Sequence, residues 1–144
     1  MKLGLLLWLA SMLPQPDADR VCLAATIYLE ARSESTLGQA AVAEVALRRR
    51  ESGQWGNSLC SVLTARGQFA LSTTNTNYIM DEPAAWQSAW QIAGNAMTTW
   101  ALPPNKRIVL VPKADHFVAA GSTPAWAKGN PLAIIGDHRF YSAN

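Results

Sequence analysis

The chain is poor in the residues that build metal centres. Among its 144 residues are two cysteines and two histidines, too few to complete a zinc site convincingly. It contains no phosphate-binding glycine loop, no Gly-x-Ser-x-Gly turn and no His-Glu-x-x-His helix. We therefore expect neither a metal nor another cofactor, and the commonest nucleotide-binding, serine-hydrolase and metalloprotease motifs are excluded.

Charge is also scarce. Charged residues make up 15% of the chain and the formal net charge is +2, which favours an anionic surface without specifying nucleic acid. We expect no nucleic-acid partner. The one dense basic run, residues 48–50, is interpreted as the solvated end of a helix. A hydrophobic fraction of 49%, without internal repeats, predicts one globular domain.

No apolar run is long enough to span a bilayer comfortably. The longest, residues 3–13, follows Lys2 and precedes the polar segment 14–19, an arrangement typical of an export signal. Cleavage after Ala18 is one outcome, although Pro16 fits poorly before such a cut; an uncleaved anchor and a buried N-terminal helix are the alternatives. We expect an exported protein with a signal peptide or anchor at 1–19 and a catalytic domain at 20–144.

The two cysteines, Cys22 and Cys60, form an even set, which in an exported protein suggests a disulfide. Closing so long a loop would stabilise the fold by about 4 kcal/mol in the chain-entropy model. Two reduced, buried thiols are the alternative.

Helical patterns fill the first two-thirds of the chain. We predict helices over 20–33, capped by Asp17 or Asp19, and over 39–51, capped by Thr36 with Gln39 three residues on. Further helices are predicted over 59–65, capped by Ser58, and from Asp81 and Pro83 to about residue 100. Residues 71–77 show no apolar period and are predicted to be a loop at the rim of a site.

The last third predicts β-structure: a short run at 107–111 and a hairpin of 132–135 with 138–141. The expected fold class is α+β, mainly α, with a small C-terminal hairpin. The helix ending near 100 carries an apolar stripe that includes three tryptophans, Trp86, Trp90 and Trp100. They are expected to pack in the core, or alternatively to form a sugar-stacking platform.

Two acidic residues end an apolar helix stripe. Leu23, Ile27, Glu30 and Glu34 are spaced four, three and four apart, so they share one face. Burial at the edge of a core should raise the pKa of Glu30, as a general acid near neutral pH requires. Arg32 lies about 200° around the helix axis from Glu30, so its positive charge should do little to oppose this rise in pKa. The alternative is an ordinary residue at the boundary of the core.

Several motifs give this stripe a context. They are Tyr28-Leu29-Glu30-Ala31-Arg32, then 38–45, 57–63, 67–70, 115–117, 124–127 and 135–141. In this order they resemble the SleB-like cell-wall hydrolase family, which includes spore cortex-lytic enzymes and wall hydrolases of bacteria and phages. The resemblance implies a compact lysozyme-like or lytic-transglycosylase-like domain. It also implies that Glu30 acts on the bond between N-acetylmuramic acid and N-acetylglucosamine.

The chain departs from such relatives in three places, the first being Ser33, where many of them have glycine and where we expect little effect. Val118 stands where many relatives have a second histidine, two residues after His116, which argues against any mechanism that needs both histidines. A further cysteine pair near 67–73 is missing, which leaves Cys22 and Cys60 as partners.

Five residues are candidates for substrate binding: Glu34, Gln68, His116, Trp126 and Tyr141. Glu34 would orient substrate or tune Glu30, or else be a solvated helix end. Gln68 would bond an acetamido group, or else anchor a loop. His116 would lie in the site, or else pack locally as His138 does. Trp126 and Tyr141 would line the site or fill a small core.

A single convincing glutamate favours a lytic transglycosylase, which needs one acid, over a hydrolytic muramidase, which usually needs two carboxylates. A zinc amidase using His116 and His138 is a further possibility, and so is a non-catalytic wall-binding module. We expect a monomer that acts on peptidoglycan glycan strands in the periplasm or cell wall and contacts the membrane transiently through its N-terminal segment. A phage endolysin for host lysis and a bacterial wall hydrolase both fit this description.

Overall fold

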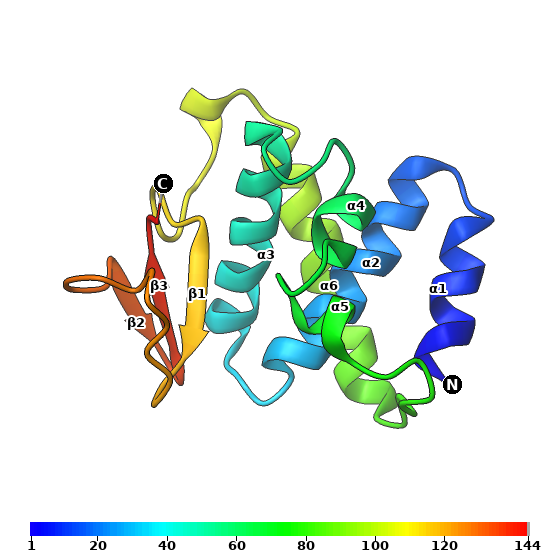
Figure 1. Ribbon diagram of the computed structural model, residues 1–144. Coiled ribbons are helices and arrows are strands. Elements are labelled where there is room, and N and C mark those ends of the chain that lie inside the picture. The colour runs from blue at the N-terminus through cyan, green and yellow to red at the C-terminus, as the bar shows by residue number, and fades with distance from the viewer. Residues whose placement is uncertain (144) are drawn as a thin grey trace.

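The computed structural model describes residues 1–143, in which helices are followed by a small antiparallel sheet (Figure 1). The elements are α1 (Leu3–Ser11), α2 (Gln15–Ala31), α3 (Thr36–Ser52), α4 (Leu59–Thr64), α5 (Ala70–Thr73), α6 (Pro83–Trp100), a 3₁₀ turn η1 (Pro104–Lys106), β1 (His116–Ala119), β2 (Ala133–Ile135) and β3 (His138–Tyr141). The α+β, mainly helical fold class is thus confirmed.

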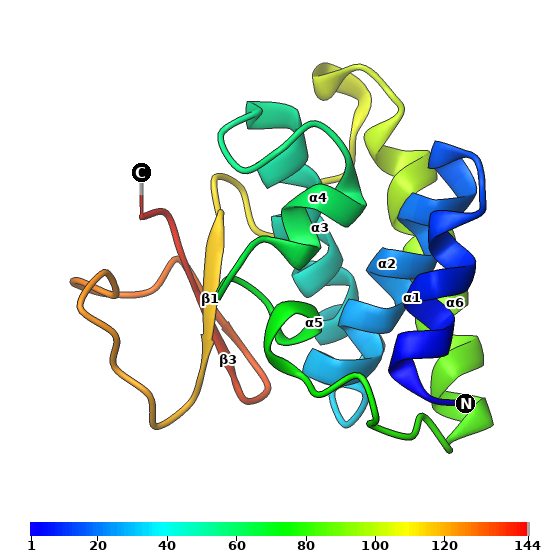
Figure 2. The ribbon, with the colours of Figure 1, turned by 45° about the vertical axis from the view of Figure 1, so that its right-hand side comes forward.

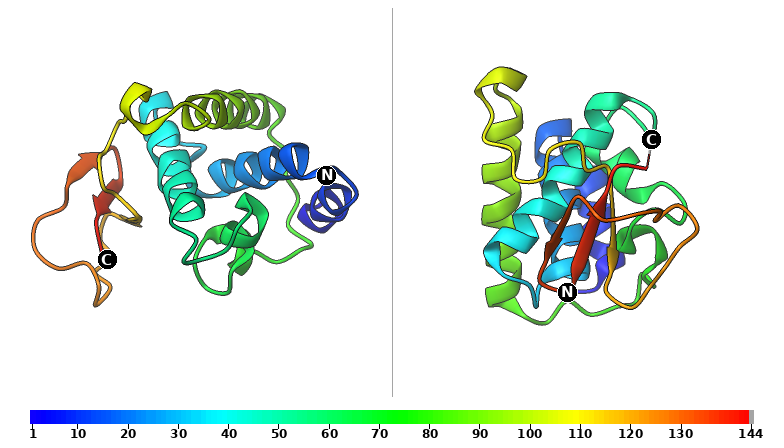
Figure 3. Two further views of the ribbon diagram at one scale, coloured as in Figure 1. Left: turned by 90° about the horizontal axis from the view of Figure 1, so that it is seen from above. Right: turned by 90° about the vertical axis from the view of Figure 1, so that its left-hand side faces the viewer.

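Helix α2 is the centre of the molecule. Every residue from Val21 to Tyr28 is buried, and a helix that is apolar on all sides must be covered on all sides. Seen from above, the other helices lie on different sides of α2 (Figure 3), and it contacts α1, α3, α4, α5 and α6. The sheet packs outside this helical bundle, beyond α3 (Figure 1).

The helices begin where capping residues allow, but the predicted caps of α2 and α3 need correction. The Ser58 cap of α4 is confirmed, and Ser61 completes a reciprocal capping box with it. At α3, the predicted Thr36 cap is wrong: the hydroxyl oxygen of Ser35 accepts the bond from the Gly38 amide. The Gln39 side chain donates to the Glu34 carbonyl instead of closing a capping box.

Helix α2 also begins earlier than predicted, at Gln15, and has no side-chain cap. Pro16 fits in its first turn, where no backbone donor is needed. Asp19 does not cap the helix, because its buried carboxylate accepts a bond from the Cys60 amide at 3.1 Å and lies 3.8 Å from the Arg50 guanidinium.

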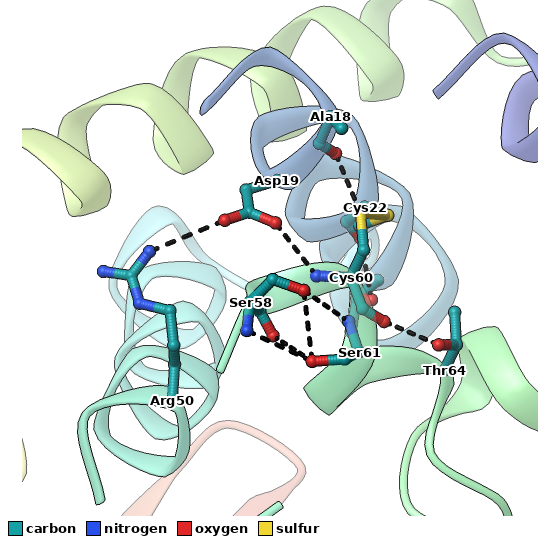
Figure 4. The surroundings of a disulfide bond; sticks show 9 residues. Ala18, Asp19, Cys22, Arg50, Ser58, Cys60, Ser61 and Thr64 are labelled. Atoms are coloured by element: carbon teal, nitrogen blue, oxygen red, sulfur yellow. Dashed lines mark hydrogen bonds and ion pairs between the residues drawn. A yellow bond between two sulfur atoms is a disulfide. The ribbon is translucent and has the colours of Figure 1, made fainter. Parts of the chain in front are cut away.

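Cys22 and Cys60 form the predicted disulfide, with Cα atoms 5.3 Å apart. It joins the middle of α2 to the first turn of α4, next to the Asp19 contacts (Figure 4). The covalent and polar links therefore fasten the same two helices.

The sheet has strand order β1-β3-β2. The predicted hairpin of β2 and β3 is confirmed, with Ile135 paired to His138 around a two-residue turn. Strand β1 was not predicted, while the strand predicted at 107–111 is wrong. The amides of Leu110 and Val111 bond the side chain of Glu44 rather than a neighbouring strand. The 71–77 loop is also partly helical, since α5 covers its beginning.

The N-terminal apolar run forms α1, which lies along one side of the bundle beside α2 (Figure 2). Leu3, Leu6 and Ala10 are buried. The backbone amides of Leu3 and Gly4 donate to the carbonyls of Tyr78 and Thr76, both at 2.8 Å. None of the helices in the described residues has both the length and the apolarity to cross a membrane.

Candidate active site

Glu30 lies in the last turn of α2, where the predicted stripe places it. Burial raises the pKa of its carboxyl, and a hydrogen bond from the Ala70 backbone amide partly opposes this effect. Leu23 and Ile27, earlier on the stripe, are fully buried. The side chain is therefore a desolvated acid at the edge of the core, with a single backbone donor on it.

The Ala70 amide is held in position by Phe69, the residue that precedes α5. Phe69 is buried and packs against Phe117 of β1 with ring centroids 6.0 Å apart. The first turn of α5 is thereby fixed between Glu30 and the sheet.

Arg32 is turned to other partners. Its guanidinium bonds the Glu82 carboxylate at 2.6 Å and the Tyr28 carbonyl at 3.1 Å. The pKa of Glu30 is shifted by burial and by the Ala70 bond. This agrees with the expectation that the charge of Arg32 has little influence on that pKa.

Glu34 is not a solvated helix end, because its side chain is 7% exposed. Its Oε1 atom accepts a 2.9 Å bond from the Asp137 amide in the β2–β3 turn, and it lies 3.8 Å from Nδ1 of His138. Burial lowers the pKa of His138, while the charges of Glu34 and Asp137 oppose this. Glu34 thus joins the end of α2 to the sheet.

Most other carboxylates are already occupied by structural contacts. Five besides Glu34 have such partners: Asp19 with Cys60 and Arg50, Glu44 with Arg48 and two amides, Glu51 with Arg107, Glu82 with Arg32, and Asp115 with His116. Burial raises the pKa of Glu30, whereas the bond from Arg107 lowers the pKa of Glu51.

Three of the predicted substrate-binding residues form one aromatic row with Trp55. His116 lies between Trp55, at a centroid distance of 6.0 Å, and Trp126, at 4.7 Å. Tyr141 follows edge-on to Trp126 at 5.7 Å. The row runs across strands β1 and β3, with His116 and Trp126 half-buried and Tyr141 buried, so Tyr141 fills the small core, as the alternative for this residue predicts.

Gln68 joins this row through Arg49. The Arg49 guanidinium donates to the Gln68 side chain at 3.1 Å and to the Asp115 carbonyl at 2.7 Å, and it lies over the Trp55 ring. Burial lowers the pKa of Arg49 to about 10, while the Asp115 charge acts to raise it. Asp115 in turn bonds Nδ1 of His116 at 2.8 Å and so orients that ring.

Arg49, Trp55 and Asp115 were missed by the sequence analysis. Residues 48–50 were interpreted as a solvated helix end, which is wrong for Arg49, now 3% exposed. A signal was present, because position 49 follows the buried residues Val42, Val45 and Ala46 by seven, four and three. Trp55 and Asp115 carry no local signal of this kind.

The two histidines are separated by the sheet register. His116 pairs with Tyr141 at one end of the ladder, and His138 pairs with Ala119 at the other, about 10 Å apart along the strands. Within the described part of the chain, no three side chains of the ligating types gather as a metal site would need. Of the α6 tryptophans, Trp100 is buried and Trp90 stacks under Arg20, which favours their role in packing.

Comparison with known proteins agrees with this architecture. Residues 33–141 match the model of the Cell Wall Hydrolase family. The catalytic domain of the germination-specific lytic transglycosylase SleB from Bacillus anthracis has a similar fold, with a TM-score of 0.66, 24% identity, and 85% of this chain and 93% of that chain covered. No curated protein matches the chain.

Proposed function

Because the chain belongs to the cell wall hydrolase family, we propose that it cleaves peptidoglycan between N-acetylmuramic acid and N-acetylglucosamine as a lytic transglycosylase. The observation that carries the proposal is the state of Glu30: it is a carboxyl at the edge of the core whose pKa is raised by burial, while six of the nine other Asp and Glu side chains hold structural contacts. A mechanism that needs a single acid, that of a transglycosylase, therefore suits the site, since a hydrolase usually needs two. The activity named for the similar SleB domain supports the same choice.

In the proposed reaction, protonated Glu30 donates its proton to the glycosidic oxygen as the bond to the muramic acid C1 breaks. The resulting carboxylate then removes the proton of the C6 hydroxyl of the same sugar, whose oxygen bonds C1. The product is a 1,6-anhydro sugar, no water is consumed, and Glu30 returns to its starting state. The Ala70 amide stabilises the carboxylate between the two steps.

The substrate's flanking sugars are proposed to lie on Trp126 and His116, with Gln68 bonding an acetamido group, while the buried Tyr141 supports the Trp126 ring edge-on. Gln68 already accepts a bond from Arg49 through its side-chain oxygen, so its amide nitrogen would serve as the donor to a substrate oxygen. Glu34 is assigned a positioning role, because both His138 and the Asp137 amide surround its carboxylate.

Mass spectrometry of digested peptidoglycan tests this proposal. Anhydromuramic products support it, whereas reducing-end muramic acid, heavier by the mass of one water, would identify a muramidase. Freed peptides lost on chelation would identify an amidase, and binding without any product would identify a wall-binding module.

We further propose that the enzyme is exported as a monomer to the periplasm or cell wall, where its substrate lies, and that it retains residues 1–18. A cut after Ala18 would fall inside α2 and remove α1, whose first residues bond Tyr78 and Thr76. The membrane contact expected of this segment during export would then be followed by its packing on α2. In a phage, such an enzyme would serve as an endolysin.

A further inference from the structure

Helix α1 has a second apolar side that the protein does not cover. Its buried residues face α2, whereas Leu5, Trp8, Leu9 and Met12 are 49%, 58%, 40% and 70% exposed. These four, here called the outward face, follow the spacing i, i+3, i+4, i+7, which places them on one stripe of the helix. Met1 and Leu13, also exposed, extend it at both ends.

Exposed apolar residues scattered singly are ordinary, but a contiguous stripe on one helix marks a contact surface. Elsewhere in the described chain, large exposed apolar side chains such as Ile108 and Ile134 stand on separate loops or strands. The outward face is therefore the one place where a helix presents its whole apolar stripe to the surroundings.

The charges around the outward face indicate the partner. Residues 1–16 carry two positive groups, the N-terminal amine and Lys2, and no carboxylate. Asp17 follows directly, and Glu82, which lies near Met1 and Leu6, is paired with Arg32. A short apolar stripe containing a tryptophan, flanked by positive charge, is suited to the headgroup region of an anionic bilayer.

A second copy of the chain fits this face less well. The outward face has four side chains, with Met1 and Leu13 at its ends, against about 20–30 residues a side in a stable complex. A bilayer needs no such number of residues on the protein, because it accepts individual side chains.

We propose that the outward face docks the folded enzyme on the surface of an anionic membrane. This inference rests on the proposed export and on the retention of residues 1–18. Since α1 packs on α2 and its first residues bond the 76–78 segment, docking would hold the enzyme at the membrane with its fold intact. A wall enzyme held there would act on the glycan strands nearest the bilayer.

Sedimentation of the purified full-length protein with lipid vesicles tests the proposal. We expect binding to vesicles of phosphatidylglycerol and phosphatidylethanolamine, and little binding to phosphatidylcholine. The triple variant Leu5→Gln, Trp8→Gln, Met12→Gln should bind at least about tenfold more weakly, and Lys2→Gln should reduce the preference for the anionic lipid. The matched control is Ile108→Gln with Ile134→Gln, which removes exposed apolar side chains elsewhere and should bind as the wild type does.

Circular dichroism and turnover of soluble glycan fragments should be unchanged in the triple variant, because its buried residues are intact. If it fails to fold, the single Met12→Gln variant carries the same test. Equal vesicle binding by wild type and variant, no binding by either, or a wild-type dimer that the variant dissociates would overturn the docking. So would an intact mass showing that the exported protein begins after Ala18. Vesicle binding by a protein that releases no glycan product would support the docking and contradict the proposed function alone.

Discussion

Glu34 and Asp137 are 103 residues apart in the chain, and the Oε1 atom of Glu34 accepts a 2.9 Å hydrogen bond from the Asp137 amide. This bond fastens the β2–β3 turn to the segment between α2 and α3, four residues after Glu30. Together with the Arg49 bond to the Asp115 carbonyl and the packing of Phe69 on Phe117, it positions the sheet relative to the proposed acid.

We expect Glu34→Gln to keep measurable activity, because the amide oxygen of glutamine still accepts the Asp137 bond and the proposed chemistry needs one acid. Glu34→Ala should lose several-fold more activity, since it leaves the turn unfastened. The measurement is initial turnover of purified peptidoglycan. A loss in Glu34→Gln as complete as that in Glu30→Gln would point instead to a two-carboxylate mechanism.

Gly136→Ala should destabilise the protein by more than a left-handed backbone alone explains. Gly136 has φ +57°, and an added Cβ would lie 2.2 Å from the Glu34 carboxylate. The matched control is Gly53→Ala, which has φ +73° and open space around it, so it isolates the backbone cost of about 1–2 kcal/mol. The urea unfolding midpoints of the two variants provide the comparison. Equal midpoints would show that the Glu34 side chain moves away from the added methyl group at no cost in stability.

Glu30→Gln should abolish glycan cleavage while stabilising the protein at neutral pH. The folded pKa of Glu30 is raised by burial, so its stabilising contribution is present below the ordinary value of 4.5 and is lost as pH rises through the folded pKa. Glutamine carries no charge to desolvate. The thermal midpoint of the variant should exceed that of the wild type at pH 7, and the difference should shrink towards pH 4.

Glu51→Gln is the control with the opposite sign. Its bond from Arg107 lowers the pKa of Glu51, so this pair, in which the carboxylate is half exposed and the guanidinium buried, contributes stability above pH 4.5 that is lost as pH falls through the lowered value. The variant should be slightly less stable than the wild type at pH 7 and fully active. If Glu30→Gln kept a tenth of wild-type turnover, Glu30 would not be the acid.

Removal of the disulfide should cost about 4 kcal/mol of unfolding free energy in the chain-entropy model, given the 38-residue separation of Cys22 and Cys60. Urea unfolding of Cys22→Ala with Cys60→Ala measures this. Dithiothreitol should shift the wild-type midpoint towards that of the variant and leave the variant unchanged. A wild-type midpoint indifferent to the reductant at full reduction would contradict the prediction.

Local signals in the sequence determined much of the fold. The Ser58 cap, Pro83 in the first turn of α6 and the Gly136-Asp137 turn each act within a few residues of the element they define, so the pattern alone identifies them. The Tyr-x-Glu-Ala-Arg motif and the apolar stripe likewise single out Glu30, because both are local to α2. The pairing of Cys22 with Cys60 could also be predicted, because the chain has only these two cysteines and the further pair found in relatives of the family is missing.

The tertiary structure decided which polar groups are buried and with what. Arg49 in a basic run and Glu34 at a helix end both have the sequence context of solvated residues, yet each is enclosed by a residue far along the chain, Asp115 and Asp137 respectively. Residues 107–111 have strand-like composition, but two of their backbone amides donate to the Glu44 carboxylate instead of to a neighbouring strand. Helix α1 has the sequence pattern of an export signal, yet it packs on α2. A short segment encodes its own period and caps, whereas the burial of a charge depends on a partner that only the folded chain brings near.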